Sequence, residues 1–547
     1  ALDFDGSNDY INIPNNASLQ LTSKVSVEAW VKINSTSGGM LIAGKIVHGG
    51  SREGYGLFAN ATNLGGSPGK IIFIAGRSWS DWWAITSNSA LQTNQWYHVC
   101  GTFDGRYLKV YINGLLDGTT DIGSTKTIND SGTNFWIGSW NAENSHYMNG
   151  YIDEVRVWNT NRTETEIQGN MMKTLLGNET GLVGYYRMDQ FDGTTLYDMT
   201  SNGNNGTLTN MDAATDWVSS SAFNTWTGAE DNSWTNADNW TNGAPTNGQS
   251  FGLYNSSNGN SFGFNTALNY GSIYLSSVNS LTLNQGAQMT FAGNTINKGT
   301  INVKSTASGD GSLITNALSG SGTYKIDRYL SSSKWHLVSS PITAGLSGVF
   351  QNIWLRPYNE ATNAFGAYIV PTTIPMPTGQ GFSVWTNTAN EIRTFSGTVN
   401  NGTVTPSVQL TGAASTTTGW NLIGNPYPSA IDWNAASGWT KTNISSTIYA
   451  WNNNQYATWN GSVGTNGGSR YVAMEQGFFV QASAVGAAIS MNNSVRLHNS
   501  VTYMKNVNEE PADIIRVNVS MNNNSDETVI AFNSNGSDNF NFETDAV

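Results

Sequence analysis

Three aspartates in the N-terminal part of the chain have the surroundings expected of oxygen ligands. Asp5 and Asp9 flank a turn of small polar residues in LDFDGSNDY, and Asp153 lies in the strand-like segment GYIDEVRVW. Strict alternation along that strand places Asp153 on the face of Val155 and Val157, where an unpartnered carboxylate is costly. Calcium takes about 6–8 oxygen ligands, so the two turn aspartates, turn carbonyls and Asp153 would form a workable cage. An ordinary solvated acidic turn is the alternative.

Aromatic side chains supply a second kind of candidate site, a platform on which a sugar ring can stack. The segments RSWSDWWAI and SWNAENSHYMNG contain the candidates, which are Trp79, Trp82, Trp83, Trp140, His146 and Tyr147. Neighbouring strand residues point to opposite faces, so one of Trp82 and Trp83 can face a core while the other faces away. The competing interpretation places most of these tryptophans in the core of a β-sandwich, with His146 as a surface residue.

Catalytic constellations are missing from the sequence. Glycosidases need two carboxylates flanking the scissile bond, yet the spacing Glu-x-Asp occurs only at Glu543–Asp545, with no third acid after it. The pattern Gly-x-Ser-x-Gly occurs at residues 65–69, 248–252 and 259–263. None of the three is followed by a predicted helix, as a nucleophile elbow requires, and the five histidines accompany no other nucleophile motif. Cys100 is the only cysteine, which excludes a disulfide framework or a cysteine zinc site and suits a small core residue. We therefore predict a protein that is not an enzyme.

The composition is that of an all-β protein with many turns. The 547 residues include 59 glycines, 20 tryptophans, 22 tyrosines and 20 phenylalanines, but only 12% are charged. Such aromatic content favours strands and argues against disorder. The formal net charge of −13 disfavours nucleic acid and anionic membrane surfaces as partners. No apolar run reaches the ~18 residues of a membrane-spanning helix, so no membrane insertion is expected.

The elements that must position the candidate residues are strands of an N-terminal domain over residues 1–223. One helix is predicted within residues 160–176, with Thr163 as N-cap and Glu166 as its capping-box partner. The clearest strands alternate strictly and end in turn residues; they are Ser26–Ile33, Trp96–Gly105 and Leu108–Gly114.

Three further segments follow. Residues 224–328 carry short strands spaced by about ten residues, which predicts a small β-solenoid. Residues 329–505 contain a duplication. WHLVSSPI matches WNLIGNPYPSAIDW, GQGFSVW matches EQGFFVQA, and PYNEATNAF and YAWNNNQYATW lie between them. The repeat predicts a β-sandwich built from two related halves, with two separate binding modules as the alternative. Residues 506–547 carry the strand-like segments IIRVNVS and TVIAFNS, and they resemble the start of a further β-domain that leads toward a C-terminal sorting signal, which is missing here.

The N-terminal motifs carry a family resemblance. LDFDGSNDYINI, SVEAWVKI, WYHVCGTFDGRYLKVYING, FWIGSW and NGYIDEVRVW occur in that order and resemble the laminin-G-like, concanavalin A-like jelly roll over roughly residues 1–175. The resemblance implies a structural calcium that ties the turn of Asp5 and Asp9 to Asp153. It also implies a domain that binds glycans or proteins, or that only spaces other domains.

The C-terminal half carries a second resemblance. WHLVSSPI, GWNLIGNPYPSAIDW, EQGFFVQA and VRLHNS resemble the region that precedes the sorting domain in surface proteins of Bacteroidota exported by the type IX secretion system. This implies an extracellular chain attached to the outer membrane, with the outer-membrane translocon and a shuttle barrel as partners during export.

Together these features predict a secreted adhesin. Its calcium-stabilised jelly roll would bind a polysaccharide or glycoprotein, and in a gliding bacterium adhesion would serve motility. Two alternatives stay open. One is a non-catalytic carbohydrate-binding part of a glycan-degrading system. The other is a passive spacer or secretion cargo with no glycan ligand.

Overall fold

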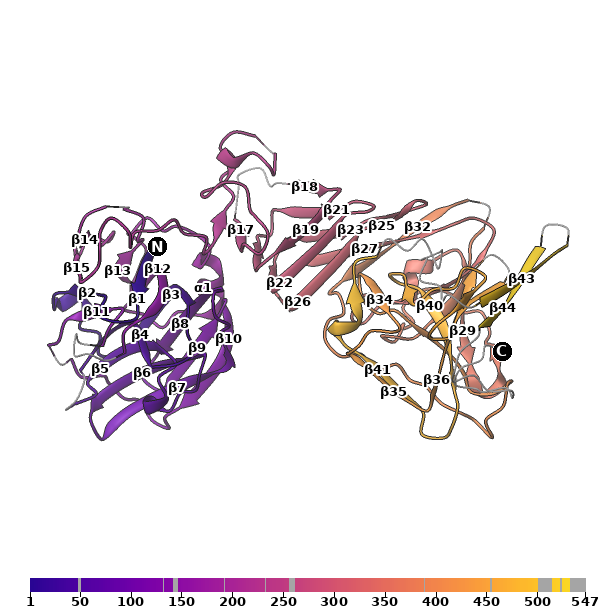
Figure 1. Cartoon of the computed structure of the whole chain (residues 1–547), viewed down its shortest axis with the longest axis horizontal. Helices are drawn as coiled ribbons and strands as arrows, with labels where there is room; N and C mark the ends of the chain where they lie inside the picture. Colours follow the sequence, from indigo (N-terminus) through magenta and orange to yellow (C-terminus); the bar gives the residue numbers. More distant parts are fainter. Residues whose placement is uncertain are drawn as a thin grey trace. The chain divides into compact units, whose positions relative to one another are not determined.

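Strands dominate both halves of the chain in the computed structural model (Figure 1). The described residues are 1–47, 51–130, 132–140, 146–190, 192–231, 233–254, 261–387, 389–452, 455–499, 514–521 and 524–531. The chain forms two compact units. The first comprises residues 1–229, 235–245 and 249–252, and the second comprises residues 230–234, 246–248 and 253–547.

The first unit is a sandwich of two antiparallel sheets, which confirms the predicted jelly-roll class. One sheet has the order β1-β12-β3-β8-β9-β10, with β13 also pairing β12. Its strands are β1 Leu2–Asp5, β3 Val25–Ile33, β8 Trp96–Phe103, β9 Tyr107–Ile112, β10 Leu115–Asp121, β12 Asn149–Trp158 and β13 Leu182–Tyr186. The other sheet has the order β14-β15-β2-β11-β4-β5-β6-β7. Its strands are β2 Tyr10–Ile13, β4 Met40–Ile46, β5 Gly54–Ala59, β6 Lys70–Ser78, β7 Asp81–Ala90, β11 Phe135–Ile137, β14 Thr195–Leu196 and β15 Gly206–Thr209.

The alternation of β3 shows how the sequence builds the core of this sandwich. Val25, Val27 and Val31 point between the two sheets and are fully buried. The residues between them, among them Glu28 and Trp30, point to the opposite face of the sheet and are also buried. The first sheet therefore has one face in the main core and a second face that other parts of the chain cover.

A β-bulge in β12 corrects the predicted position of Asp153. The pairing with β3 slips between Asp153 and Arg156, and Glu154 at the slip has φ +52°. The extra residue reverses the alternation, so Ile152 lies in the core row together with Val155. Asp153 pairs with Trp30 and so lies on the other face of the sheet, not on the valine face as strict alternation predicted.

The helix α1, Glu164–Asn170, lies in the predicted segment and is shorter than it. The Thr163 side chain accepts from the Glu166 N–H, and the Glu166 carboxylate accepts from the Thr163 N–H, which confirms the capping box. Cys100 on β8 is fully buried in a small cluster with Tyr111 and Ile167 of this helix, which confirms it as a core residue.

Parallel short strands form the solenoid predicted in the second segment. One stack joins β18, β21, β23 and β27 in parallel register, and β32 adds to β27 in the antiparallel direction. In the other stack β22 pairs in parallel with β19, β20 and β26. The bounds are β18 Ser261–Phe264, β19 Ala267–Tyr270, β20 Ile273–Leu275, β21 Ser280–Leu283, β22 Gln288–Asn297, β23 Thr300–Val303, β26 Ser312–Ser319, β27 Thr323–Leu330 and β32 Glu391–Gly397.

The sequence duplication appears as two sheets with the same strand order. The first repeat has the order β28-β31-β29-β30, and the second has β33-β40-β36-β37, extended by β38. In each, the Trp-x-Leu strand pairs with the Gln-Gly-Phe strand, which then pairs with a hairpin. The bounds are β28 Trp335–Val338, β29 Trp354–Asn359, β30 Ala364–Phe365, β31 Phe382–Trp385, β33 Trp420–Gly424, β36 Ile444–Asn452, β37 Gln455–Trp459, β38 Gly464–Thr465 and β40 Gly477–Ala482.

Two reciprocal bridges relate the repeats by a pseudo-two-fold axis. Val338 of the first repeat bridges Gln476 of the second, and Ile423 of the second bridges Gln380 of the first. These four residues occupy equivalent positions in the two sequence repeats. The repeats therefore meet as two related halves of one body, as the sequence predicted.

Eleven further strands complete the described fold. They are β16 Asn224–Thr225, β17 Phe251–Leu253, β24 Ser305–Thr306, β25 Gly309–Asp310, β34 Ala430–Asp432, β35 Trp439–Thr442, β39 Tyr471–Val472, β41 Ala488–Met491, β42 Arg496–Leu497, β43 Ile514–Met521 and β44 Asn524–Ala531. Among the described residues, no helix combines the length and apolar character needed to cross a membrane.

Candidate functional site

The structure separates the three aspartates that were predicted to share a calcium ion. β1 runs antiparallel to β12 with Asp5 opposite Asn149 and Leu2 opposite Ile152. Asp153 therefore lies at the other end of β1 from the Asp5 turn. In the described part of the chain, no group of three histidine, cysteine, aspartate or glutamate side chains is placed to hold a metal ion. The three residues do not fit one cage, and calcium binding stays a prediction for the turn alone.

Asp5 and Asp9 have hydrogen-bond partners within their own turn. The Asp5 N–H donates to Asp9 Oδ2 at 2.9 Å, and the Ser7 N–H donates to Asp5 Oδ1 at 2.7 Å. Burial, with the nearby charge of Asp5, raises the pKa of Asp9 to about 6. The turn thus concentrates negative charge, and a bound cation would relieve that repulsion.

Asp153 finds its partners inside the chain. Its Oδ1 accepts from the Glu154 N–H at 3.0 Å and lies 3.7 Å from the amino group of Ala1. Burial raises its pKa, whereas the Ala1 charge and a hydrogen bond from Ser220 oppose that rise. These contacts supply the polar partners that a buried carboxylate requires.

A buried polar network occupies the same face of the sheet. Arg156 lies 2.7 Å from Glu154 Oε2 and 3.5 Å from Glu28 Oε1. Tyr185 donates to Glu154 Oε2 at 2.7 Å, and His98 Nε2 lies 3.4 Å from Glu28 Oε2. Burial raises the pKa of Glu154 to about 7, although the charge of Arg156 opposes the rise. The network sits beneath the segment that contains α1, and His98 is buried within it.

The aromatic residues predicted to form a platform on the jelly roll lie in different environments. Trp140 is 3% exposed, and its Nε1 donates to the Ile46 carbonyl at 3.1 Å. The ring of His146 packs edge-on against Trp140 with centroids 5.0 Å apart. Tyr147 beside it is half-buried. Trp140 is therefore a packing residue, as the competing interpretation expected.

Trp82 and Trp83 point to opposite faces of β7, as alternation predicted. Trp83 packs against the main core and stacks on Phe103 at 6.1 Å. Trp82 packs on the other face, with the Arg52 guanidinium 4.0 Å from its ring centroid. Trp79 is 57% exposed, and its ring lies 5.0 Å from the same guanidinium. Of the six predicted residues, Trp79 presents the most open aromatic surface.

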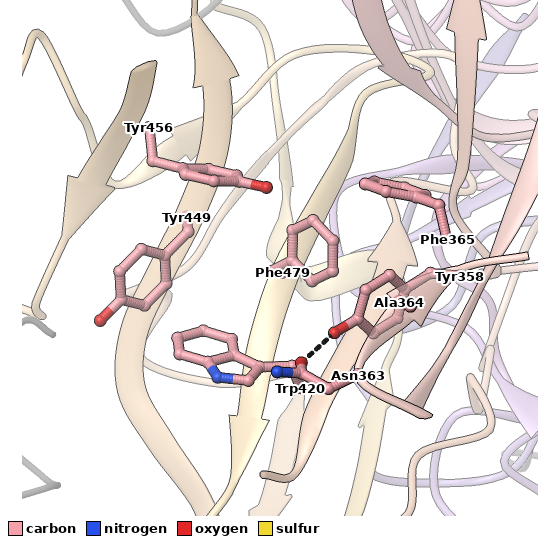
Figure 2. A pocket seen from close by; sticks show the side chains of 8 residues that line it. All are labelled: Tyr358, Asn363, Ala364, Phe365, Trp420, Tyr449, Tyr456 and Phe479. Carbon is pink, nitrogen blue, oxygen red and sulfur yellow. Dashed lines mark hydrogen bonds between the residues drawn. The ribbon is translucent and has the colours of Figure 1, made fainter. Parts of the chain in front are cut away.

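A pocket of about 400 Å³ lies elsewhere, in the second unit between the two sequence repeats. Figure 2 shows aromatic rings around an open space. The lining residues are Tyr358, Asn363, Ala364, Phe365, Trp420, Tyr449, Tyr456 and Phe479. Its volume and aromatic lining are those of a small-molecule site.

Both repeats contribute to the pocket through equivalent hairpins. Tyr358 and Phe365 face each other across the β29–β30 hairpin with ring centroids 5.3 Å apart. In the second repeat, Tyr456 on β37 lies at the position equivalent to Phe365. Phe479 on β40 is 4% exposed and stands edge-on to Tyr358 at 4.8 Å. It therefore joins the aromatic groups of the two repeats at the base of the pocket.

The second repeat supplies the opposite wall. Trp420 on β33 and Tyr449 on β36 pack edge-on with centroids 4.9 Å apart. The Trp420 Nε1 donates to the Thr416 carbonyl at 3.1 Å, which fixes the orientation of the indole ring. Edge-to-face packing of this kind holds aromatic rings in defined orientations. The pocket therefore has rigid walls.

Neutral polar groups line the edge of this aromatic pocket. The Tyr358 hydroxyl donates to Asn363 Oδ1, a contact drawn in Figure 2. Asn363 itself is exposed and has φ +49°, a left-handed conformation that asparagine tolerates. Tyr456 is 37% exposed, and its hydroxyl makes no hydrogen bond within the described residues. Burial raises the pKa of Tyr358 to about 12, so its hydroxyl is uncharged at neutral pH.

The chemistry of the pocket is binding through flat apolar faces and neutral hydrogen-bonding groups. A pyranose ring has C–H groups on its faces and hydroxyls on its edge, which matches aromatic walls combined with amide and phenol groups. None of the eight lining residues is acidic or basic. The pocket therefore lacks the carboxylate pair that glycoside hydrolysis requires.

Sequence reasoning missed this pocket although its residues were visible. The segments WNLIG, YAWNNNQYATW and EQGFFVQA contain four of its eight lining residues, and the hairpin YNEATNAF contains the other four. The signal available was that aromatic residues recur at equivalent places in both repeats. That pattern alone does not say that the two aromatic faces meet.

The N-terminal fold belongs to a known class: residues 5–168 match the concanavalin A-like lectin/glucanases superfamily. The chain as a whole belongs to the family described as a domain of unknown function (DUF8693), which matches residues 225–547, more than half of its length. No curated protein matches the chain.

Several solved structures are similar to parts of the chain. One, from Bacteroides ovatus, is described as a candidate carbohydrate binding protein; it is 23% identical with a TM-score of 0.31, and the match covers 39% of this chain and 60% of that one. The heptameric SAP-like pentraxin from Limulus polyphemus is 17% identical with a TM-score of 0.25, covering 31% and 79%. The CBM40 of the Ruminococcus gnavus IT-sialidase bound to α2,3-sialyllactose is 16% identical with a TM-score of 0.26, covering 30% and 92%.

Proposed function

We propose that this protein is a non-catalytic carbohydrate-binding protein whose sugar site is the aromatic pocket between the two repeats. The observation that carries the proposal is the pocket itself: about 400 Å³, six aromatic rings, and neutral amide and phenol groups at its edge. A sugar ring entering it would cover apolar surface on both sides. Because the walls pack against each other, little conformational entropy would be lost on binding.

The wider setting follows from the sequence resemblances and is part of the proposal. The protein would be a secreted adhesin attached to the cell surface, exported through the type IX translocon and shuttle barrel. The jelly roll would be a spacer or a second recognition domain, with calcium at the Asp5–Asp9 turn as a structural cofactor. A binding part of a glycan-degrading system is the second candidate. The match of residues 5–168 to the lectin/glucanases superfamily supports this second candidate and the adhesin equally.

A glycan array probed with the full chain tests the proposal. The array should be run with wild type, Tyr456→Ala and Trp79→Ala, each in calcium and in chelator. Tyr456 and Trp79 are both exposed aromatic residues, one in the pocket and one on the jelly roll, so each serves as the control for the other. Loss of an exposed aromatic contact typically weakens binding by about 1–2 kcal/mol or more.

The expected result is a glycan signal that Tyr456→Ala removes and Trp79→Ala leaves intact. A signal lost only in Trp79→Ala would move the site to the jelly roll and refute the pocket. Silence of the wild type in both conditions would refute carbohydrate binding and favour the spacer. Dependence of the signal on calcium would support the calcium part of the proposal separately.

A further inference from the structure

Three tryptophans lie side by side on the sheet of the first repeat. Trp385 on β31 pairs directly with Trp335 on β28 and with Trp354 on β29. Directly paired residues of antiparallel strands share a face, so the three indoles form a ladder across the sheet. Leu355, next to Trp354, points to the other face and is fully buried. The ladder therefore lies on the outer face.

Part of this aromatic surface is open to solvent, although Trp335 and Trp385 themselves are half-buried. Trp354 is 54% exposed, and Tyr368 beside it is 51% exposed. Their ring centroids are 4.9 Å apart, and Tyr368 also stacks on Trp335 at 6.4 Å with an interplanar angle of 11°. Single exposed aromatics are common, whereas a contiguous exposed group marks an interaction surface.

Arg356 connects the ladder to the pocket. It lies two residues after Trp354 and two before Tyr358 on β29, so all three side chains leave the same face of the strand. Its guanidinium is 4.1 Å from the Trp335 ring and 4.3 Å from the Phe365 ring. Phe365 is a wall of the pocket. The charge therefore sits between the two aromatic regions.

The guanidinium of Arg356 has no anionic partner in the part of the chain that the structure describes. No hydrogen bond or ion pair of its side chain is found there, and its buried Nε lacks any acceptor. A guanidinium sandwiched between rings keeps its edge available for a planar bidentate contact with a carboxylate. The contacts with the Trp335 and Phe365 rings restrict the position of the guanidinium before a ligand binds.

We propose that the pocket, Arg356 and the tryptophan ladder form one extended site for an acidic oligosaccharide, a sugar chain with isolated carboxylates of the uronic acid type. The inference rests on the proposed function of the pocket. One sugar occupies the pocket, the carboxylate of a neighbouring unit binds Arg356, and further units stack on the ladder. Isolated carboxylates suit the site better than dense sulfate or phosphate, because the chain carries a net charge of −13 and Arg356 is the one cation among the residues named for this site.

The test compares two probes that share a sugar backbone and differ in whether their carboxyl groups are ionised or esterified. Tetragalacturonate carries a carboxylate on each unit, and its methyl ester has the same backbone without charge. Binding of each to the full chain should be measured by calorimetry for wild type, Arg356→Met, Arg356→Lys, Trp354→Ala and Trp79→Ala. Thermal melts confirm that each variant is folded. Trp79 is the matched control because it is as exposed as Trp354 but lies in the other unit.

Wild type should bind the acid about 10–100-fold more tightly than the ester, the size expected for a bidentate Arg–carboxylate contact. Arg356→Met should remove that preference, and Arg356→Lys should keep only part of it. Trp354→Ala should weaken both probes by about 5–30-fold, and Trp79→Ala should change neither.

Equal binding of acid and ester by wild type, or an unchanged preference in Arg356→Met, would overturn the inference while leaving a glycan pocket in place. If neither probe binds and the array is silent as well, the proposed function fails together with the inference. If the array shows other glycans bound in the pocket but Trp354→Ala leaves their affinity unchanged, the ladder is no part of the site.

Discussion

Gly424 offers the sharpest test of the pseudo-two-fold arrangement that creates the pocket. Ser339 and Gly424 occupy equivalent positions in WHLVSS and WNLIGN, and they meet where the repeats cross. A Cβ added at Gly424 would lie 2.2 Å from the Ser339 Cβ. Carbon atoms pack at about 3.5–4.0 Å. Only one of the two equivalent positions can therefore carry a side chain.

Gly424→Ala should destabilise the second unit by about 2–3 kcal/mol, near the upper end of the usual cost of overpacking. The strands have little freedom to separate. The Gly424 N–H donates to the Gly379 carbonyl at 2.9 Å, and the Ser339 N–H donates to the Glu475 carbonyl at 3.0 Å. At about 2–4 °C per kcal/mol for a domain of this size class, the melting temperature should fall by about 5–10 °C.

A double-mutant cycle separates the clash from other effects. Ser339→Gly alone should cost about 1 kcal/mol, because the Ser339 hydroxyl donates to the Asn425 carbonyl at 2.6 Å in a buried position. Combined with Gly424→Ala, it should remove the clash, so the double variant is more stable than Gly424→Ala alone. Gly263→Ala is the control, since the atom nearest to its added Cβ is the end of the Asn284 side chain at 3.4 Å. Additive losses in the cycle would refute contact between the equivalent positions.

Three further predictions concern buried carboxylates. The pKa of Glu154 is about 7 in the folded state, against an ordinary value of 4.5. Its contribution to stability is therefore full at low pH and declines as the pH rises from 4.5 through 7. Glu154→Gln should make the melting temperature depend less on pH in that interval. Burial also raises the pKa of Glu475 well above its ordinary value, and within the described residues neither carboxylate oxygen has a partner. Glu475→Gln should therefore match wild type in acid and be more stable at alkaline pH, whereas a variant that is less stable at every pH would contradict this. Asp153→Asn should lower the melting temperature equally in calcium and in chelator, because its contacts lie within the chain; a larger loss in calcium would restore the predicted cage.

Local patterns were sufficient for much of the fold. The alternation of Val25, Val27 and Val31 identifies a strand with one face in a core, and the Thr163–Glu166 pair identifies the start of α1. Each depends only on neighbours in sequence. The duplication likewise predicted two related halves, because equal segments fold into equal strand orders.

The misplacement of Asp153 shows where local patterns fail. One extra residue at Glu154 reverses the alternation, and no residue type in GYIDEVRVW requires a bulge at that place. The bulge also removes the reason for predicting a calcium ligand here, because Asp153 does not lie in the core row and needs no cation there. A ligand set inferred from alternation is only as secure as the register of the strand.

The pocket and the ladder follow from divergence between two equal sheets. Ser383 of the first repeat corresponds to Phe479 of the second, and each pairs with an equivalent residue, Arg356 and Tyr449 respectively. In the second repeat the aromatic pair fills the sheet surface and builds the pocket wall. In the first repeat the small Ser383 is buried, and the half-buried Arg356 beside it brings a positive charge to this face. The same fold thus provides an enclosed neutral site and an open cationic one next to each other, and changing this pair of residues in either repeat should shift the balance between them.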